Sequence, residues 1–361
     1  MQSRADPGEA RSTAQVLSEY GKNDIKVDCE ILVSNLMATE LGKNPGYSIR
    51  VIDELGHGKR GIVYLVAGTD DTLFALKVDD GPGERSIIDP SRECADTVLQ
   101  SHFLGNLKGQ LEESPAGLVR VGEESVYLMD LAKLGDFKTY FRSHGVKPLD
   151  PLDPLDTLDP QNETAALMVL SILHAVQCML KQGYLYSDMK DVNCLATIGG
   201  DDKPTAILGD LGGFMKLETR NNGYATYPDP TITPDNPGLY WIDDTWTSDK
   251  VRKIITWSIG ILLAQISGAY IDHLSYDKLN EDTPLTDARL VYDVKDNNIF
   301  GDIIKKCLKN NPEERCTPAE ICESLLALLP SPAADLADLA ALSSPEPWEF
   351  ELIKSLVEGA E

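Results

Sequence analysis

The stretch Tyr184–Leu195 constrains this chain most, because it sets three polar side chains at close spacing directly after a run of apolar residues with helical periodicity. It reads YLYSDMKDVNCL, so a lysine and an asparagine follow Asp188 two and five residues later. If the segment is a loop, the side chains of Asp188, Lys190 and Asn193 can converge on one polar site. A second acidic motif, GDLGG at residues 209–213, follows at the separation expected of a turn after a short hairpin.

These two motifs carry the groups that phosphoryl transfer needs. Asn193 and Asp210 offer the oxygen ligands that a divalent cation takes, which leaves Asp188 to face a substrate hydroxyl. The motifs resemble the catalytic loop and metal-binding turn of the protein kinase superfamily, whose pattern is H-R-D-x-K-x-x-N followed by D-F-G. Asp188, Lys190, Asn193, Asp210 and Gly212 keep that pattern, whereas Tyr186, Ser187 and Leu211 depart from it.

The resemblance implies a bilobal α+β fold, with a small antiparallel β-rich N-lobe and a larger, mainly α-helical C-lobe. A glycine-rich turn, GHGKRGIV at residues 56–63, lies between the predicted strands Ser48–Leu55 and Ile62–Ala67. Glycine lets backbone N–H groups approach phosphates without a side chain in the way, whereas a Rossmann turn would lead into a helix. The resemblance assigns nucleotide binding here to Gly56, Gly58, Gly61 and Val63.

One lysine lies within the apolar strand Thr72–Val78, where its ammonium group needs a partner. The resemblance implies that this residue, Lys77, holds the α and β phosphates of ATP and pairs with a glutamate of the next helix. Glu93 is the predicted partner, on a helix that begins near Asp89–Pro90. Glu84, in a Gly/Pro turn, is the alternative.

A predicted hairpin, Leu118–Val121 with Ser125–Met129, leads into a stretch that resembles the linker between kinase lobes. By position, Met129 is the gatekeeper and Asp136 meets the ribose. The resemblance assigns nucleotide binding to Ala75, Met129, Asp130, Ala132, Asp136 and Leu195.

Three later stretches extend the resemblance. The apolar pattern of Thr164–Gln182 predicts an amphipathic helix, and Lys253–Gly260 resembles the D-x-W-S-x-G helix of the family. Ile255 replaces the aspartate that accepts N–H groups of the catalytic loop, so another group must satisfy them. Residues 303–317 match the closing motif of the large lobe, including Arg315, for which Asp243 and Asp244 are the nearest acidic candidates.

The predicted organisation has four parts: an N-terminal helical extension (1–47), the N-lobe (48–129), the C-lobe (130–330) and a C-terminal helical tail (331–361). Apolar spacing from Ser12 to Leu41 predicts two helices in the extension. Residues 148–160 repeat Leu-Asp-Pro, which excludes a regular helix and predicts an acidic surface insertion. The N-terminal helices and the insertion are candidate sites for a protein partner. They also resemble features of secreted, rhoptry-type kinases of intracellular parasites.

The charge and composition of the chain argue against several classes of binding partner. A formal net charge of −25 argues against non-specific binding to nucleic acid or an anionic membrane surface. No apolar run approaches the ~20 residues of a membrane helix, and the first ten residues show no secretory signal. A soluble protein, cytoplasmic or secreted with its signal removed, is expected. The seven cysteines form no C-x-x-C pair, so a zinc site is not predicted; free thiols are the main expectation, and a disulfide among Cys307, Cys316 and Cys322 is the alternative.

Two functions stay open at this point. The first is an active kinase that uses ATP with Mg²⁺ or Mn²⁺ and phosphorylates serine or threonine hydroxyls, because the position of Lys190 resembles serine/threonine kinases. The second is a pseudokinase that binds a nucleotide or a protein; Ile255 and the missing A-P-E triplet favour it. Ser187 replaces the arginine that pairs with an activating phosphate, so assembly without phosphorylation of residues 214–245 is expected.

Overall fold

The computed structural model describes residues 27–28, 30–32, 42–58, 61–79, 107–110, 119–121, 124–146, 159–181, 184–199, 203–209, 214–217, 223–224, 229, 239–240, 247–268, 270–272, 291–293, 298–309 and 311–329. The chain divides into two compact units. The first comprises residues 1–94 and 105–131, and the second comprises residues 95–104 and 132–361.

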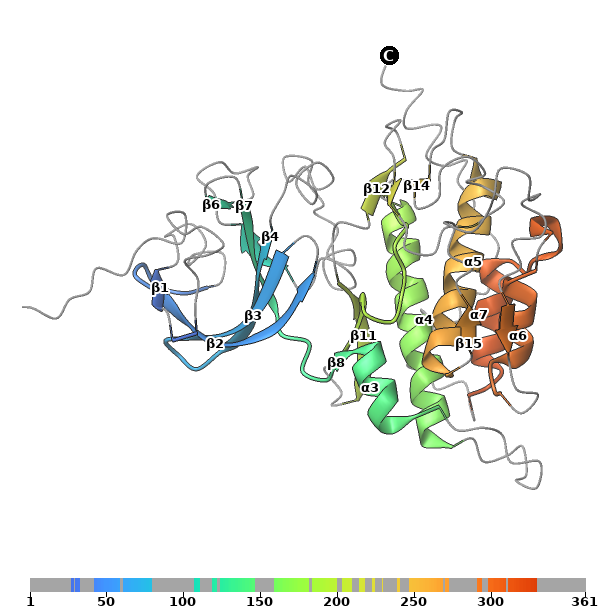
Figure 1. The fold of residues 1–361 in the computed structure, drawn as a ribbon, viewed down its shortest axis with the longest axis horizontal. Helices are drawn as coiled ribbons and strands as arrows, with labels where there is room; N and C mark the ends of the chain where they lie inside the picture. Colours follow the sequence, from blue (N-terminus) through green and yellow to red (C-terminus); the bar gives the residue numbers. More distant parts are fainter. Residues whose placement is uncertain are drawn as a thin grey trace, which may run out of the picture. The chain divides into compact units, whose positions relative to one another are not determined.

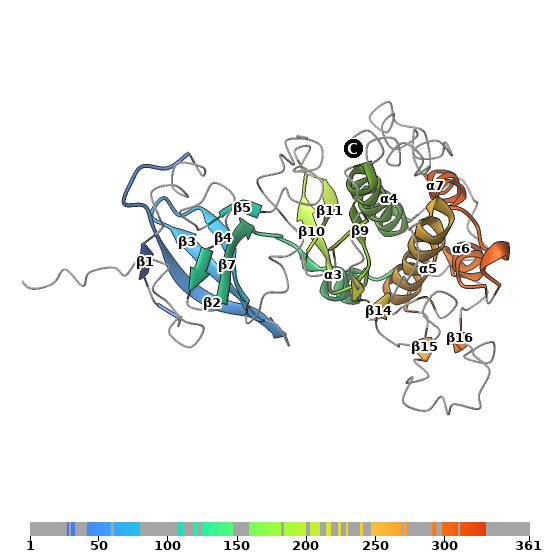
Figure 2. The same ribbon diagram turned by 90° about the horizontal axis from the view of Figure 1, so that it is seen from above.

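The first unit is an antiparallel sheet (Figures 1 and 2). Within the described residues its strands are β1 (Glu30–Leu32), β2 (Ser48–Gly58), β3 (Gly61–Gly68), β4 (Leu73–Asp79), β5 (Leu107–Gln110), β6 (Val119–Val121) and β7 (Glu124–Asp130). They are ordered β1-β2-β3-β4-β7-β5, and β6 also pairs with β7. The strands and the hairpin that the sequence predicts between residues 48 and 129 are therefore confirmed.

Apolar side chains at alternate positions of the strands form the core of this unit. Side chains two residues apart in a strand lie on the same face of the sheet. Ile49 and Val51 in β2, Val66 in β3, and Leu76 and Val78 in β4 are all fully buried. β-branched residues dominate these positions, which fits their preference for a pleated, half-buried surface.

The strand β1 corrects one prediction. Residues 30–32 were expected to be helical, but they pair antiparallel with β2, and Ile31 lies opposite Ile49. Ile31 is 0% exposed, so the pairing buries its side chain and completes hydrogen bonds at an edge of the sheet. Tertiary pairing therefore overrides the helical spacing at this point. The rest of the predicted helical extension lies largely outside the described residues.

The second unit is mainly helical. Its described helices are α3 (Phe137–His144), α4 (Pro160–Lys181), α5 (Ser248–Ile266), α6 (Gly301–Cys307) and α7 (Pro318–Leu326), with a 3₁₀ turn at Pro312–Glu314. Short strands accompany them: β8 (Gly135–Asp136), β9 (Tyr184–Tyr186), β10 (Cys194–Ile198), β11 (Pro204–Leu208), β12 (Phe214–Lys216), β13 (Gly223–Tyr224), β14 (Leu239–Tyr240), β15 (Tyr270–Asp272) and β16 (Val291–Asp293). None of the described helices is long and apolar enough to cross a membrane.

Helix α4 is the centre of this unit. It contacts β11, β9 and α7, and α5 contacts α6 and α7 (Figure 1). Its buried side chains surround the helix axis, as expected for a helix covered on most sides; they include Met168, Val169, Leu170, Ile172, Leu173 and Val176. The predicted helix over Thr164–Gln182 is confirmed, but it is buried on most sides and is not amphipathic as the sequence predicts. The β-rich first unit and helical second unit confirm the predicted α+β fold class.

The start of α4 revises the predicted insertion. Asp159 accepts a hydrogen bond from the backbone N–H of Gln161 at 2.9 Å, and Pro160 is the first helical residue. An aspartate cap followed by proline is a common way to begin a helix. The last Asp-Pro of the Leu-Asp-Pro repeat thus starts α4, while residues 148–158 and the tail 331–361 lie outside the described part of the chain.

Candidate catalytic loop and its supports

The loop between β9 and β10 brings together three of the predicted catalytic and metal-binding residues. Lys190 Nζ lies 2.7 Å from Asp188 Oδ2. Asn193 Nδ2 donates to the same oxygen at 3.1 Å and to the Asp188 carbonyl oxygen at 2.8 Å. Asp188 is 5% exposed, so these donors compensate a carboxylate held largely away from water.

Backbone hydrogen bonds hold this loop in shape. The N–H groups of Asn193 and Cys194 both donate to the carbonyl of Lys190, at 3.0 and 3.1 Å. The Gly209 N–H donates to the carbonyl of Asn193 at 2.8 Å, which ties the loop to the end of β11. The convergence of Asp188, Lys190 and Asn193 thus follows from local turns and from the β10–β11 hairpin.

Helix α5 supplies the support that Ile255 cannot give. Ile255 is buried and apolar. Instead, Gln265 Oε1 accepts a hydrogen bond from the Asp191 backbone N–H at 3.0 Å. Gln265 is not among the predicted site residues, although a single amide within the apolar end of α5 (ILLAQI) is a visible signal.

Tyr186, which departs from the family pattern, links the loop to the end of β11. Its side chain is 1% exposed, and its hydroxyl donates to the Gly209 carbonyl at 2.6 Å. Gly209 is also tightly enclosed, since a Cβ there would lie 2.8 Å from Leu195 Cδ1. Tyr186 therefore anchors the residue that directly precedes Asp210, which itself lies outside the described residues.

The first unit aligns several of the residues assigned to nucleotide binding. In the sheet, Gly56 pairs with Val63, and Val63 pairs with Lys77. Ala75 pairs with Met129 on β7. Glycines 58 and 61 face each other across the turn, whose tip, residues 59–60, is outside the described residues together with Glu93.

Asp136 has a structural role that the sequence analysis did not predict. In β8 it pairs with Leu195 of β10. Its Oδ1 accepts the Thr139 backbone N–H at 2.6 Å and so caps α3. Ala132 also takes part in this turn, because its carbonyl accepts the Gly135 N–H at 3.1 Å.

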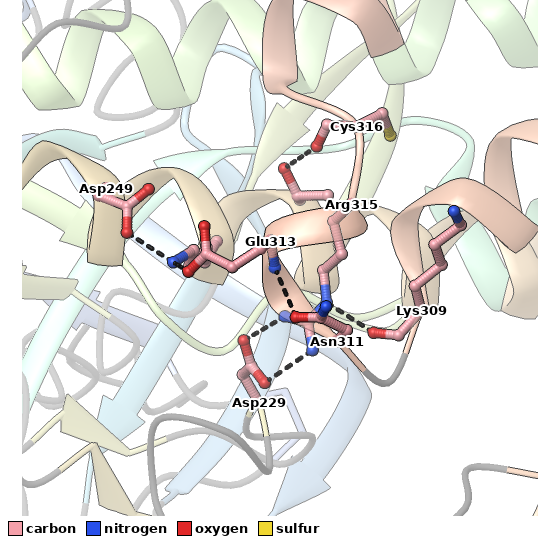
Figure 3. Close-up of polar contacts among 9 residues, drawn as sticks. Asp229, Asp249, Lys309, Asn311, Glu313, Arg315 and Cys316 are labelled. Carbon is pink, nitrogen blue, oxygen red and sulfur yellow. Dashed lines mark hydrogen bonds and ion pairs between the residues drawn. The ribbon is translucent and has the colours of Figure 1, made fainter.

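The partner of Arg315 differs from the prediction. Arg315 binds Asp229 through both terminal nitrogens, with an Nη2–Oδ1 distance of 3.1 Å (Figure 3). Arg315 Nε donates to the Lys309 carbonyl at 2.9 Å, and the guanidinium lies 4.8 Å from the ring centroid of Trp257. The two side chains of the pair are 1% and 0% exposed. A bidentate pair satisfies both buried charges, so Asp229 takes the place expected of Asp243 or Asp244.

The structure describes one of the two residues predicted to bind a cation. Asn193 uses its amide nitrogen on Asp188, which leaves its amide oxygen as the atom to offer a hard cation. The second predicted ligand, Asp210, is not among the described residues. Within those residues, no group of three or more His, Cys, Asp and Glu side chains could hold a metal ion.

Comparisons with known proteins give distant likenesses. No protein-family model matches the chain. It is 24% identical to the insulin receptor-related protein of Cavia porcellus over 299 residues, which is 78% of this chain and 21% of that protein. It is 24% identical to the insulin-like growth factor 1 receptor of Xenopus laevis over 298 residues, 78% of this chain and 20% of the receptor. The chain thus spans about a fifth of the length of these curated relatives.

Among solved structures, the chain is similar to the PknI kinase domain of Mycobacterium tuberculosis. The TM-score is 0.42 and the identity 16%, over 78% of this chain and 96% of that domain.

Proposed function

We propose that this protein is an ATP-dependent protein kinase that phosphorylates serine or threonine hydroxyls of a protein substrate. One observation carries the proposal: Lys190 and Asn193 both donate to a single oxygen of the buried Asp188. A purely structural loop has little reason to bury a carboxylate beside a lysine when an apolar residue would cost less. The arrangement instead suits a carboxylate held in a fixed orientation for chemistry.

The loop residues divide the work of the reaction. The substrate hydroxyl oxygen attacks the γ-phosphorus of ATP and forms a new P–O bond, while the bond to the bridging β–γ oxygen breaks and ADP leaves. The hydroxyl proton passes to the Asp188 carboxylate. Lys190, fixed beside Asp188, is the cation that favours negative charge on the transferring phosphoryl group.

The assignments for nucleotide binding rest on the resemblance to the kinase motifs. We assign the phosphates to the glycine turn at residues 56–61 and to Lys77, and the adenine to the backbone at Asp130 and Ala132. When bound, Mg²⁺ or Mn²⁺ neutralises phosphate charge, and Asn193 and Asp210 would be its protein ligands. Glu93 remains the proposed partner of Lys77.

A pseudokinase is the alternative, and a specific feature favours it: Ile255 leaves α5 without the acidic acceptor that the family uses. Gln265 weakens that objection, because it supplies an acceptor from the same helix to the Asp191 N–H. A protein partner at the N-terminal extension or at the acidic insertion suits either function. The four-part division of the chain also remains a proposal.

Thermal denaturation with ATP, with and without Mg²⁺, tests both functions. A ligand at ~100 times its dissociation constant adds about 2.7 kcal/mol to the free energy of unfolding. A stabilisation that requires the cation is expected. An assay of γ-phosphate transfer to a peptide library with serine, threonine or tyrosine acceptors then distinguishes the kinase from the pseudokinase. Binding without transfer to any acceptor favours the pseudokinase, and transfer to tyrosine alone contradicts the serine/threonine assignment. No stabilisation at millimolar nucleotide and metal contradicts both the active kinase and a pseudokinase that binds a nucleotide.

A further inference from the structure

Two thiols of the second unit lie in contact, and neither belongs to the proposed catalytic loop. Cys307, the last residue of α6, and Cys316, just before α7, have sulfur atoms 3.5 Å apart. The four cysteines whose side chains the structure describes are all free thiols, including these two. We infer that Cys307 and Cys316 form an oxidation site that takes a hydroperoxide and yields a reversible disulfide.

Three elements fix the two cysteines relative to each other. The Cys316 N–H donates to the carbonyl of Lys306 at 3.4 Å, so the backbones beside the two thiols are hydrogen-bonded. The Thr256 hydroxyl of α5 donates to the Cys316 carbonyl at 3.0 Å. A Cβ at Gly260 of α5 would lie 2.6 Å from Cys307 Cβ, so Cys307 is packed tightly against that helix.

The remaining movement is small. A disulfide needs a sulfur–sulfur distance of about 2.05 Å. The two sulfur atoms must therefore approach by about 1.5 Å from their 3.5 Å separation. Rotation about the Cα–Cβ bond of Cys316 moves its sulfur over such a distance, and Cys316 is the less buried of the two residues.

The environments of the two thiols set the order of the reaction. The hydrogen bond from Cys307 lowers the pKa of Cys316, whereas burial raises the pKa of Cys307. The thiolate is the reactive form, and Cys316 is also the more accessible sulfur. Cys316 is thus the thiol that meets the oxidant, and Cys307 is the resolving thiol.

The chemistry balances with a hydroperoxide as the only oxidant. The Cys316 sulfur attacks one peroxide oxygen, an S–O bond forms, the O–O bond breaks, and the leaving oxygen takes a proton to give water or an alcohol. The Cys307 sulfur then attacks the Cys316 sulfur, the S–O bond breaks, and a water molecule leaves with the Cys307 proton. Two electrons pass from the two sulfurs to the peroxide.

Peptide mapping without reduction tests this inference on the full chain. The reduced protein is treated with hydrogen peroxide, its free thiols are blocked, and it is digested with trypsin. Lys309 and Arg315 separate the two cysteines, so the disulfide appears as two linked peptides that a dithiol reductant releases. Because Cys322 is in the same tryptic peptide as Cys316, Cys322→Ser is the matched control.

The link is expected in the wild type and in Cys322→Ser, and it should be lost in Cys316→Ser and in Cys307→Ala. Alanine keeps the Cβ that packs on Gly260, and Cys316→Ser changes a partly exposed residue, so at least one variant is expected to retain the fold. The bond closes a short loop, so the oxidised wild type should melt a few degrees higher. A link that persists in Cys316→Ser, or oxidation of Cys316 to a sulfinic acid without any link, would overturn the inference.

Discussion

The Tyr186 hydroxyl donates a 2.6 Å hydrogen bond to the carbonyl oxygen of Gly209. Tyr186 closes β9, just before the loop that holds Asp188, and Gly209 follows β11, so the bond joins the two ends of the candidate machinery. Both residues are buried. Tyr186 therefore links β9 to the end of β11 by a hydrogen bond, in addition to packing in the core.

Removing this hydroxyl should weaken both stability and cation-dependent nucleotide binding. Tyr186→Phe keeps the ring but leaves the buried Gly209 carbonyl without its donor, which costs about 1–3 kcal/mol. Urea denaturation measures the loss, and titration of ATP in the presence of Mg²⁺ measures the binding. Tyr140→Phe, on α3, is a control that keeps the loop contact intact. Equal ATP affinity in Tyr186→Phe and wild type would show that this contact does not position the turn at Asp210.

Gln265 should act on the reaction through the loop backbone. Gln265→Leu removes the acceptor of the Asp191 N–H, whereas Gln265→Glu keeps an oxygen at the same reach. We expect kcat to fall about tenfold in the leucine variant, about 1.4 kcal/mol in barrier height, with KM for ATP little changed. The glutamate variant should recover most of that loss. If both variants match the wild type, another group supports the loop.

Asp188→Asn should abolish phosphoryl transfer and leave ATP binding largely intact. An asparagine cannot take the proton of the attacking hydroxyl, and a well-placed base contributes roughly 10²–10⁴-fold to rate. Rates of γ-phosphate transfer and the ATP-dependent rise in melting temperature are the two readouts. Asp249→Asn, at an exposed position on α5, serves as the control substitution. Full transfer by Asp188→Asn would remove the loop from the catalytic assignment.

Local spacing explains which parts of the site could be predicted from the sequence. Asp188, Lys190 and Asn193 are close in the chain, so a single turn brings them together, and their hydrogen bonds join residues two and five positions apart. The strands around Val63 and Lys77 follow equally from alternation, which is also a local property. Asp210 and Glu93 lie outside the described residues, so their roles stay predictions.

Long-range partners could not be predicted in the same way. Gln265 is 74 residues from Asp191, and Asp229 is 86 residues from Arg315. Such pairs depend on how elements pack, and spacing along the chain carries no record of that. The helix predicted over residues 30–32 was wrong for a related reason, because Ile31 acquires its strand conformation by pairing with Ile49. A substitution in a known motif still carries information. Ile255 in place of the aspartate predicted that another group accepts hydrogen bonds from the loop N–H groups.

The buried pair of Arg315 and Asp229 should matter for stability far more than the exposed pair nearby. Replacing one partner, as in Arg315→Met, removes the bidentate cation from a buried carboxylate, and breaking such a pair costs about 3–5 kcal/mol. The double variant Arg315→Met with Asp229→Leu removes both charges and should recover part of that loss. Glu313→Gln breaks the exposed contact with Lys253, which is expected to cost no more than about 1 kcal/mol.

Urea denaturation of the wild type and these three variants supplies the free energies of unfolding for the comparison. A loss in Arg315→Met below that of Glu313→Gln would contradict the structural assignment of the pair. Recovery in the double variant would show that most of the loss in Arg315→Met comes from the buried charge left behind and not from the net contribution of the pair.

The last prediction concerns pH. Burial, with a smaller contribution from the charge of Asp136, raises the pKa of Asp191 above its ordinary value of 3.8. A carboxyl group whose pKa is higher in the folded state binds its proton more tightly there, so its contribution favours folding at low pH and is lost as pH rises through the raised pKa. Asp191→Asn should therefore be more stable than the wild type at pH 7, and the difference should shrink as the pH falls toward 3.8.

Urea denaturation at pH 7 and at pH 4 measures this difference. Asparagine retains an oxygen that can accept the Val192 backbone N–H, so the substitution changes the charge and little else. Asp71→Asn, in an exposed turn with a positive φ that asparagine tolerates, is the control and should show no comparable gain. A stability difference between Asp191→Asn and wild type that stays constant or grows on acidification would mean that the Asp191 carboxyl is better solvated in the folded protein than its position beside α3 indicates.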